Sequence, residues 1–238
     1  MRRIGFELVP VQRGGWEAES LLGLHLHKLF ARLRIDAVVD VGARTGEYGA
    51  WLRRNGYAGP IASFEPVAES FAVLEQRARG DKRWTVHRCA LGRDDGIAEI
   101  NVAQATEFSS FHSVNDAAHR LFGSDVRVDR VERVERHRLD ALLPELFVAP
   151  ESRVFLKVDT QGWDLEVLEG ATGGLDRVVA LQTEVSMHAI YEDAPTMADS
   201  LAWLGAHGYA VSGFFPVGFD ARGRVLEFDC VAVRVEPS

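Results

Sequence analysis

Three polar residues in the second half of the chain follow apolar runs, and their side chains could handle a proton. Asp159 comes directly after the run 154–158, Glu184 follows the run 178–183, and His188 stands four residues further on. Carboxylates and imidazoles are the usual general bases of enzymes, and the unperturbed pKa of histidine lies nearest neutral pH. We therefore rank His188 first as a catalytic base and keep Asp159 and Glu184 as further catalytic candidates.

The same three residues could also bind a divalent metal ion. If the chain between Glu184 and His188 is helical, the spacing i, i+4 places both on one face, and both residue types are common metal ligands. Each residue also has a purely structural alternative. Asp159 could cap the following helix, Glu184 could pair with an arginine, and His188 could be an ordinary surface histidine.

A glycine-containing loop near residue 40 forms a second candidate site. It follows an apolar run and reads Asp40-Val41-Gly42-Ala43-Arg44-Thr45-Gly46. The spacing differs from the G-x-G-x-x-G of nicotinamide-binding proteins, and the Lys-Ser/Thr of a phosphate-binding P-loop is missing. A glycine at the carboxyl end of a strand lets a ligand approach the backbone closely. The loop favours an amino-acid or nucleoside ligand over a pyrophosphate, and its structural alternative is a plain turn between a strand and a helix.

An acidic residue after the next apolar run strengthens this interpretation. Glu65, followed by Pro66, ends the run 61–64 and lies 19 residues beyond Gly46. A carboxylate about 20 residues after such a loop can accept hydrogen bonds from the hydroxyls of a ribose. A lone glutamate in a proline turn is common, but the loop and the acid together predict nucleoside binding.

The elements that must position these residues alternate along the chain. Short apolar runs have the composition of buried parallel strands, at 36–41, 61–64, 84–89, 154–158 and 178–183. Helical spacing of apolar residues lies between them, at 47–55, 67–79, 163–168 and 195–207. The runs 209–215 and 225–235 are joined by a short turn, which predicts an antiparallel pair. We expect a doubly wound α/β fold whose mostly parallel seven-stranded sheet ends in an antiparallel hairpin.

The remaining segments predict an N-terminal extension, a main domain and an insertion within that domain. Apolar residues at helical spacing in 17–33 predict that residues 1–35 form an N-terminal helical extension, ahead of a domain of residues 36–238. The runs 97–102 and 131–139 resemble strands, and the second alternates apolar and charged residues as an exposed edge strand does. We expect residues 103–138 to be an insertion on the substrate side, because such loops often carry substrate contacts.

Composition narrows the class of protein. The chain has 238 residues, 47% of them hydrophobic, which is enough for one sizeable core. Its net charge of −8 argues against a nucleic-acid partner. Cys89 and Cys230 form neither a disulfide framework nor a zinc pattern, so we expect a cytoplasmic protein. No signal peptide and no membrane span of about 20 apolar residues is evident, and the oligomeric state is left open.

One block of the sequence is specific to a family. The run KVDTQGWDLEVLEGA, Lys157 to Ala171, closely resembles the signature of the FkbM-type methyltransferases. Three more segments are similar to that family: residues 40–46, residues 64–66, and Glu184-Val185-Ser186 followed by Tyr191. The resemblance covers roughly residues 36–234. It implies a Rossmann-like class I methyltransferase fold and S-adenosylmethionine as the cofactor.

The resemblance also implies a role for each matching residue. The methionine part of the cofactor would lie among residues of the glycine loop, namely Asp40, Gly42, Ala43, Thr45 and Gly46. Glu65 would hold the ribose with Pro66 beside it, Ala90 and Leu91 would lie near the adenine, and Asp159 would lie beside the transferred methyl group.

Known members of the family mostly methylate hydroxyl oxygens. The resemblance therefore implies O-methylation of a hydroxylated small-molecule acceptor in secondary metabolism, such as a saccharide, a glycolipid or a polyketide. N- or C-methylation on the same scaffold is one alternative. Another is a catalytically silent module that binds the cofactor and serves a partner protein. Nicotinamide-dependent oxidoreduction is disfavoured by the glycine spacing and by the expected hairpin.

Overall fold

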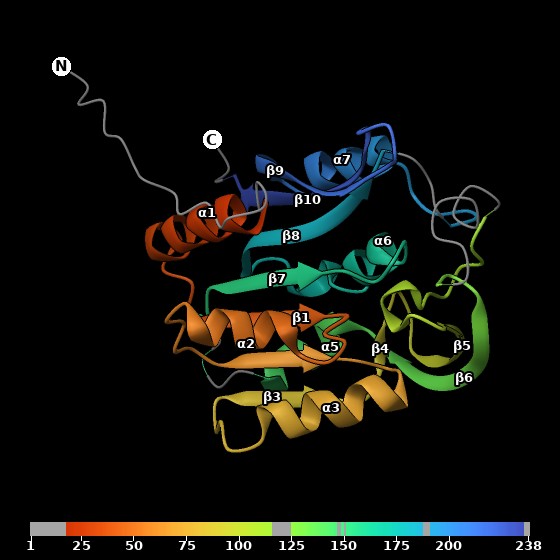
Figure 1. Cartoon of the computed structure of the whole chain (residues 1–238). Coiled ribbons are helices and arrows are strands. Elements are labelled where there is room, and N and C mark those ends of the chain that lie inside the picture. Colours follow the sequence, from red (N-terminus) through yellow and green to blue (C-terminus); the bar gives the residue numbers. More distant parts are fainter. Residues whose placement is uncertain (1–17, 116–124, 147–148, 150, 188–190, 236–238) are drawn as a thin grey trace.

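The computed structural model describes residues 18–115, 125–146, 149, 151–187 and 191–235. Its main feature is a seven-stranded sheet with the order β3-β2-β1-β7-β8-β10-β9 (Figure 1). The strands are β1 (Ala37–Val41), β2 (Ile61–Phe64), β3 (Trp84–His87), β7 (Val154–Val158), β8 (Val178–Ser186), β9 (Tyr209–Phe219) and β10 (Val225–Arg234). All neighbours pair in parallel except β10, which is antiparallel to both β8 and β9. The predicted doubly wound fold with a terminal hairpin is confirmed.

Helices cover both faces of this sheet. One face packs against α1 (Ala18–Leu33), α2 (Glu47–Arg54) and α3 (Ala68–Ala78). The other face packs against α5 (Leu139–Leu146), α6 (Asp164–Glu169) and α7 (Met197–Ala206). Because strand side chains alternate between faces, neighbours such as Phe155 and Leu156 enter different clusters of buried residues. The apolar runs of the sequence reflect this burial on two sides.

The sheet face under α1 and α2 changes from apolar to polar along the strands. Toward the amino ends it is apolar, with Val38, Phe155 and Ala180 fully buried. Toward the carboxyl ends of the parallel strands it is polar, because Asp40 and Lys157 come two residues later on the same face. Ligands of open α/β sheets bind beyond the carboxyl ends of the strands. The amino half of this face is therefore core, and the carboxyl half is where a site can form.

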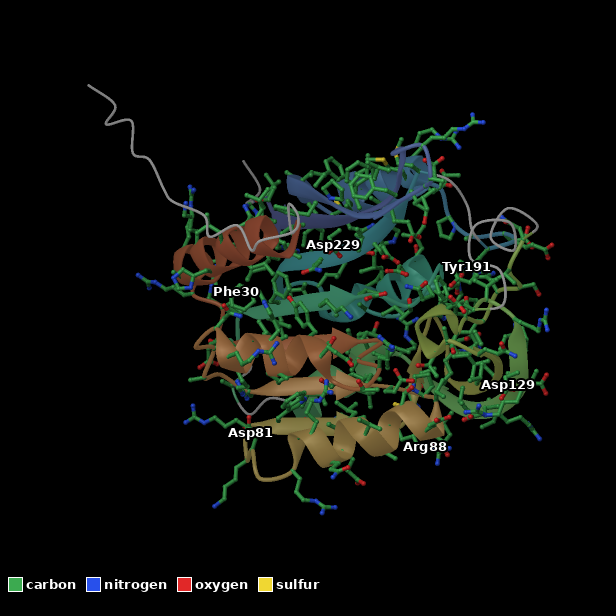
Figure 2. The ribbon with its side chains drawn as sticks, viewed as in Figure 1. Phe30, Asp81, Arg88, Asp129, Tyr191 and Asp229 are labelled. Carbon is green, nitrogen blue, oxygen red and sulfur yellow. The ribbon has the colours of Figure 1, made fainter. Side chains whose placement is uncertain are left out.

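Helix α1 covers the same face of the sheet over β7 and β9. Its buried residues Leu22, Leu26 and Leu29 recur at helical spacing, as the sequence predicts. Phe30 of α1 packs against Phe155 of β7, with ring centroids 4.8 Å apart, and lies between helix and sheet in Figure 2. Within the described residues, no helix is long and apolar enough to cross a membrane.

A small second sheet lies beside the main one, with the order β4-β6-β5. It consists of β4 (Ala90–Leu91), β5 (Gly96–Ala103) and β6 (Val128–His137). The prediction that 131–139 is an edge strand is confirmed for residues 131–135, which among the described residues pair with β5 alone. The last two residues of β6, Arg136 and His137, pair with β4, and residues 128–136 pair with β5. The charges alternate because one face of this sheet is in water, while the other face, which includes Val102 and Val134, packs against Val67.

Two further details differ from the sequence interpretation. Helix α5 was not predicted, since it has only eight residues and contains Pro144, a helix breaker. The short helices η1 (Thr106–Phe108) and η2 (Thr172–Gly174) were also not foreseen. The expected insertion 103–138 contains η1 and β6, while residues 116–124 lie outside the described part of the chain.

Candidate active site

The glycine loop brings the backbone of β1 against the end of β7. Gly42 has a φ of +72°, and a Cβ built there would lie 1.8 Å from the backbone oxygen of Asp159. Only glycine fits such an approach. The backbone N–H groups of Gly42 and Ala43 both donate to the Phe64 oxygen, at 3.1 and 3.0 Å. Gly46, with a φ of +85°, turns the chain into α2. The loop is thus fixed between the ends of three strands.

A buried lysine ties this loop to β7. The Lys157 ammonium lies 3.4 Å from Oδ1 of Asp40 and 3.3 Å from Oδ2 of Asp159, and donates to the Gly42 oxygen at 3.3 Å. Burial alone would lower the pKa of Lys157, but the carboxylates of Asp159 and Asp40 raise it overall. Asp40 is fully buried and also accepts from Ser63 Oγ at 3.1 Å. Lys157 therefore keeps its charge, which offsets that of Asp40.

Glu65 presents a carboxyl group held by two backbone amides. Its Oε2 accepts from Arg44 N at 2.8 Å, and its Oε1 accepts from Val67 N at 2.9 Å. Burial raises the pKa of Glu65 to about 7, although both amides act in the opposite direction. Each oxygen keeps a lone pair for a further donor. A fixed carboxyl group of this kind can accept two hydroxyl groups from one ligand.

A cavity of about 860 Å³ joins these features, and its volume is near the upper end for small-molecule sites. Toward β2 and β4 its wall is apolar around Glu65, formed by Pro66, Val67, Ala90, Leu91, Ile100 and Phe111. Toward β9 it ends at a second apolar wall, formed by Leu22, Trp51, Pro216, Val217 and Phe219. Strand order separates these walls, with the ends of β1, β7, β8 and β10 between them.

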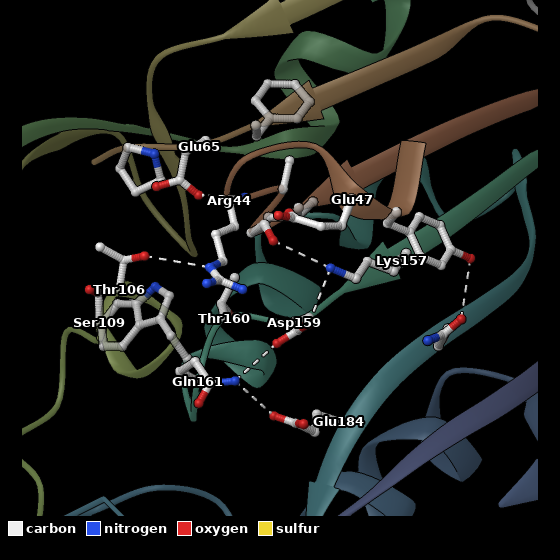
Figure 3. A pocket seen from close by; sticks show the side chains of 18 of the residues that line it. Arg44, Glu47, Glu65, Thr106, Ser109, Lys157, Asp159, Thr160, Gln161 and Glu184 are labelled. Carbon is white, nitrogen blue, oxygen red and sulfur yellow. Dashed lines mark hydrogen bonds and ion pairs between the residues drawn. The ribbon is translucent and has the colours of Figure 1, made fainter. Parts of the chain in front are cut away.

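The middle of the cavity is lined by polar side chains, several of them visible in Figure 3. Gln161 Nε2 donates to Asp159 Oδ1 at 3.1 Å and to Glu184 Oε2 at 3.2 Å. Gln182 Nε2 donates to Asp229 Oδ1 at 2.9 Å. Asp229 lies opposite Glu184 in the antiparallel ladder of β10 and β8. Three neighbouring strands therefore contribute a carboxyl group each to one surface.

Burial and mutual repulsion raise the pKa values of three carboxyl groups on β8 and β10, those of Glu184, Glu227 and Asp229. Burial, followed by the charge of Asp159, raises the pKa of Glu184 well above its ordinary value. Burial likewise raises the pKa of Asp229 to about 6 and that of Glu227 to about 7. A carboxylate that is costly to ionise binds a proton more readily, so Glu184 is a stronger base than an exposed glutamate.

The structure brings most of the sequence-predicted residues to this cavity. The residues that line it are Gly42, Ala43, Glu65, Pro66, Ala90, Leu91, Asp159 and Glu184. Asp40, Thr45 and Gly46 do not line it. Asp40 lies beneath the loop, while the Thr45 hydroxyl donates to Glu47. His188 lies outside the described residues.

Two structural ideas about the predicted catalytic residues are wrong. Glu184 belongs to β8, which continues to Ser186, so the helical spacing that would place it on one face with His188 does not apply. Asp159 does not cap the next helix, because α6 begins at Asp164 and its N-cap is Trp163.

Within the described residues, no group of three His, Cys, Asp or Glu side chains could hold a metal ion. A divalent metal therefore has no support among those residues.

Among the cavity residues without a role in the sequence interpretation are four from its polar middle: Lys157, Gln161, Gln182 and Asp229. A signal for three of them exists in the strands. Polar residues two apart interrupt apolar runs, as in Lys157 with Asp159, Gln182 with Glu184, and Glu227 with Asp229. A period of two places both members of a pair on one face. Buried polar pairs at strand ends thus mark the site.

Comparison with known proteins agrees with the fold and the loop. A family model described as the methyltransferase FkbM domain matches residues 40–211, which is more than half of the chain. The protein is a methyltransferase. It belongs to the FkbM methyltransferase family, as the block from Lys157 to Ala171 predicts. No curated protein matches the chain.

Several solved structures are similar to the chain. Magnesium protoporphyrin IX methyltransferase from Synechocystis PCC 6803, with bound SAM, is 12% identical, with a TM-score of 0.48 over 92% of this chain and 78% of that one. An rRNA methylase from Streptococcus thermophilus is 12% identical, with a TM-score of 0.49 over 90% and 97%. 1,6-Didemethyltoxoflavin-N1-methyltransferase from Burkholderia thailandensis is 14% identical, with a TM-score of 0.46 over 92% and 80%.

Proposed function

We propose that this protein is an S-adenosylmethionine-dependent O-methyltransferase that acts on a hydroxyl group of a small molecule such as a saccharide, a glycolipid or a polyketide. The observation that carries the proposal is the shape of the cavity. One continuous space joins a half built around Gly42 and Glu65 to a half built around Glu184 and the wall of β9. A transferase needs such an arrangement, because donor and acceptor must meet in one cavity.

The first half suits the cofactor. Gly42 allows the close approach of a ligand to the loop, and Glu65 offers two fixed oxygens to the ribose hydroxyls. Ala90 and Leu91 supply a flat apolar wall for the adenine. The carboxylate of Asp159, at the end of β7, favours a positive charge beside it. When bound, the cofactor supplies an electrophilic methyl group on its sulfonium.

The second half suits the acceptor. Trp51, Pro216, Val217 and Phe219 offer apolar surface to its body, while Glu184 belongs to the polar middle of the cavity. Five carboxyl side chains and three basic ones line the whole cavity. One of the basic residues, Lys157, is already engaged by two carboxylates. This balance disfavours an anionic acceptor and leaves a neutral hydroxyl as a suitable nucleophile.

A hydroxyl acceptor must lose its proton by the end of the transfer. Of the described candidates we assign this proton to Glu184, because burial raises its pKa while no cation neutralises it closely. Asp159 is less available for this role, because it already pairs with the Lys157 ammonium 3.3 Å away. His188 remains the alternative. Glu184→Gln should lower kcat about 10²–10⁴-fold, and the same loss in His188→Asn with full activity in Glu184→Gln would move the role to His188.

The domain limits follow from the same proposal. Residues 36–238 would form the methyltransferase domain, preceded by the N-terminal extension 1–35. The insertion 103–138 would lie over the cavity, which is supported by Thr106, Ser109 and Phe111 in its lining.

Turnover tests the proposal directly. The purified protein is incubated with S-adenosylmethionine and a panel of neutral hydroxylated acceptors, with amine-bearing and thiol-bearing compounds alongside. We expect S-adenosylhomocysteine to form together with a methyl ether that is identified by NMR. Methylation at nitrogen or carbon alone would replace the O-methyltransferase assignment. Cofactor binding without any transfer across the panel would favour a silent cofactor-binding module.

A further inference from the structure

The loop between β7 and α6 holds a residue in an unusual backbone conformation. Gln161 has a φ of +54°, and the next residue, Gly162, has a φ of +88°. Residues other than glycine are uncommon in this left-handed region. Such conformations persist where surrounding contacts impose them, and they are frequent at functional sites. The contacts of Gln161 therefore deserve a functional explanation.

The side-chain amide of Gln161 uses both of its ends. Nε2 donates to Asp159 Oδ1 at 3.1 Å and to Glu184 Oε2 at 3.2 Å, and Oε1 accepts from the Tyr191 hydroxyl at 2.9 Å (Figure 3 shows the first two bonds). The opposite orientation would direct the amide oxygen at two carboxyl groups. This network therefore fixes the amide in one orientation.

The surroundings hold Gln161 rigidly. Its backbone oxygen accepts from Ser110 Oγ at 2.6 Å, and Ser110 is only 1% exposed. Tyr191 is 3% exposed and pairs with Val114 in an isolated β-bridge. The amide is therefore supported by two segments that are distant in sequence from β7 and β8. Support of this kind keeps a catalytic group within the narrow geometry that reaction requires.

Glu184 depends on this amide for its orientation. Within the described residues, Gln161 is the one hydrogen-bond donor to the Glu184 carboxyl group. The charged groups that act on Glu184 from neighbouring elements repel it: Asp159 directly after β7, Asp164 on α6, and Glu227 and Asp229 on β10. Lys157, the nearest buried cation on β7, is engaged by Asp40 and Asp159.

We propose that Gln161 is a positioning residue, which bridges Asp159 and Glu184 and so aims the Glu184 carboxyl group at the acceptor hydroxyl. This role rests on the proposed function, with Glu184 as the base. Gln161 itself exchanges no proton with the acceptor. It keeps two carboxyl groups at a fixed separation that their mutual repulsion would otherwise widen.

The test is a double-mutant cycle on turnover. Gln161→Met keeps the length of the side chain and removes all three of its hydrogen bonds. We expect kcat to fall about 10–100-fold, because a displacement of about 1 Å can cost 10²-fold. The KM values for cofactor and acceptor should stay within about twofold. In a Glu184→Gln background, Gln161→Met should cause little further loss, since residues that act as a unit are not additive. Gln76→Met, at an exposed position of α3, is the matched control.

Other outcomes would overturn the role. Losses that multiply in the double variant would mean that Gln161 does not act through Glu184. A raised KM for the cofactor with unchanged kcat would place Gln161 in the cofactor site instead. Urea unfolding needs no turnover: in a cycle of Gln161→Met with Glu184→Leu, which removes the acceptor, additive losses of stability would contradict the hydrogen bond itself. A wild type that transfers no methyl group would refute the proposed function, which is a different result from an active wild type with an additive cycle.

Discussion

Replacement of Lys157 by methionine should destabilise the fold strongly. The Lys157 side chain is 7% exposed, and its carboxyl partner on β1, Asp40, is completely buried. Loss of the cation would leave that carboxyl group buried with Ser63 as its remaining hydrogen-bond donor. Removal of one partner from a buried ion pair costs about 3–5 kcal/mol. Since domains of this kind are stable by about 5–15 kcal/mol, Lys157→Met should lose a large part of its stability.

The double variant Asp40→Asn/Lys157→Met makes the prediction sharper. Once both charges are absent, the penalty of an unpaired buried charge disappears, and replacement of a whole buried pair is often nearly neutral. The double variant should therefore be more stable than Lys157→Met alone. Urea unfolding followed by circular dichroism measures all of these free energies. Arg93→Met serves as a control, because Arg93 is 58% exposed beside Glu166 and its loss should cost about 1 kcal/mol or less.

The reasoning would be refuted by a Lys157→Met variant that unfolds at the wild-type urea concentration. It would be refuted equally by a double variant that shows the full sum of the two single losses. Either result would mean that Lys157 and Asp40 do not compensate each other inside the protein.

Three more predictions concern the cavity. Gly42→Ala should abolish binding of S-adenosylhomocysteine, because its Cβ would collide with the backbone at 1.8 Å, whereas Gly205→Ala meets open space and should bind normally, as calorimetry can measure. The affinity for S-adenosylhomocysteine should rise with pH toward about 7, by at most about tenfold per unit, and then level off. Burial raises the pKa of Glu65 to about 7 and the ribose hydroxyls need its ionised form. A flat wild-type profile, or the same slope in Glu65→Gln, would contradict this. Phe219→Ala should lower kcat/KM for the acceptor about fivefold without a change in cofactor affinity, because Phe219 lines the cavity. Phe214→Ala should not, because Phe214 belongs to the same strand but does not line the cavity, and equal losses in both variants would count against an acceptor wall on β9.

The order of strands and helices could be predicted from the sequence because burial on two sides leaves an unmistakable pattern. Strand β7 was predicted at its observed bounds, since four of its five residues are apolar. Strand β8 was predicted too short, because the polar residues Glu184 and Ser186 interrupt its apolar run, and Glu184 lines the cavity. Polar residues that line a site at the end of a strand thus make the strand look shorter in the sequence than it is. Helix α5 was missed for a local reason, the proline inside it.

The cofactor half of the site was easier to predict than the acceptor half. Gly42 and Glu65 belong to a short local pattern in which backbone geometry and spacing are constrained. Asp229 comes from the last strand, and only the antiparallel pairing of β10 with β8 places it opposite Glu184. The conformation of Gln161 depends on contacts with Ser110 and Tyr191. Long-range contacts of this kind leave no periodic signal in the sequence.

Calorimetric titration with S-adenosylmethionine, S-adenosylhomocysteine and NAD tests the central claim most directly. Wild type should bind both adenosyl ligands and not NAD. Glu65→Ala should lose this binding, whereas Glu75→Ala, at an exposed position of α3, should keep it. Wild-type affinity in a folded Glu65→Ala variant would contradict the assigned cofactor site, and failure of the folded wild type to bind either adenosyl ligand would contradict the account as a whole.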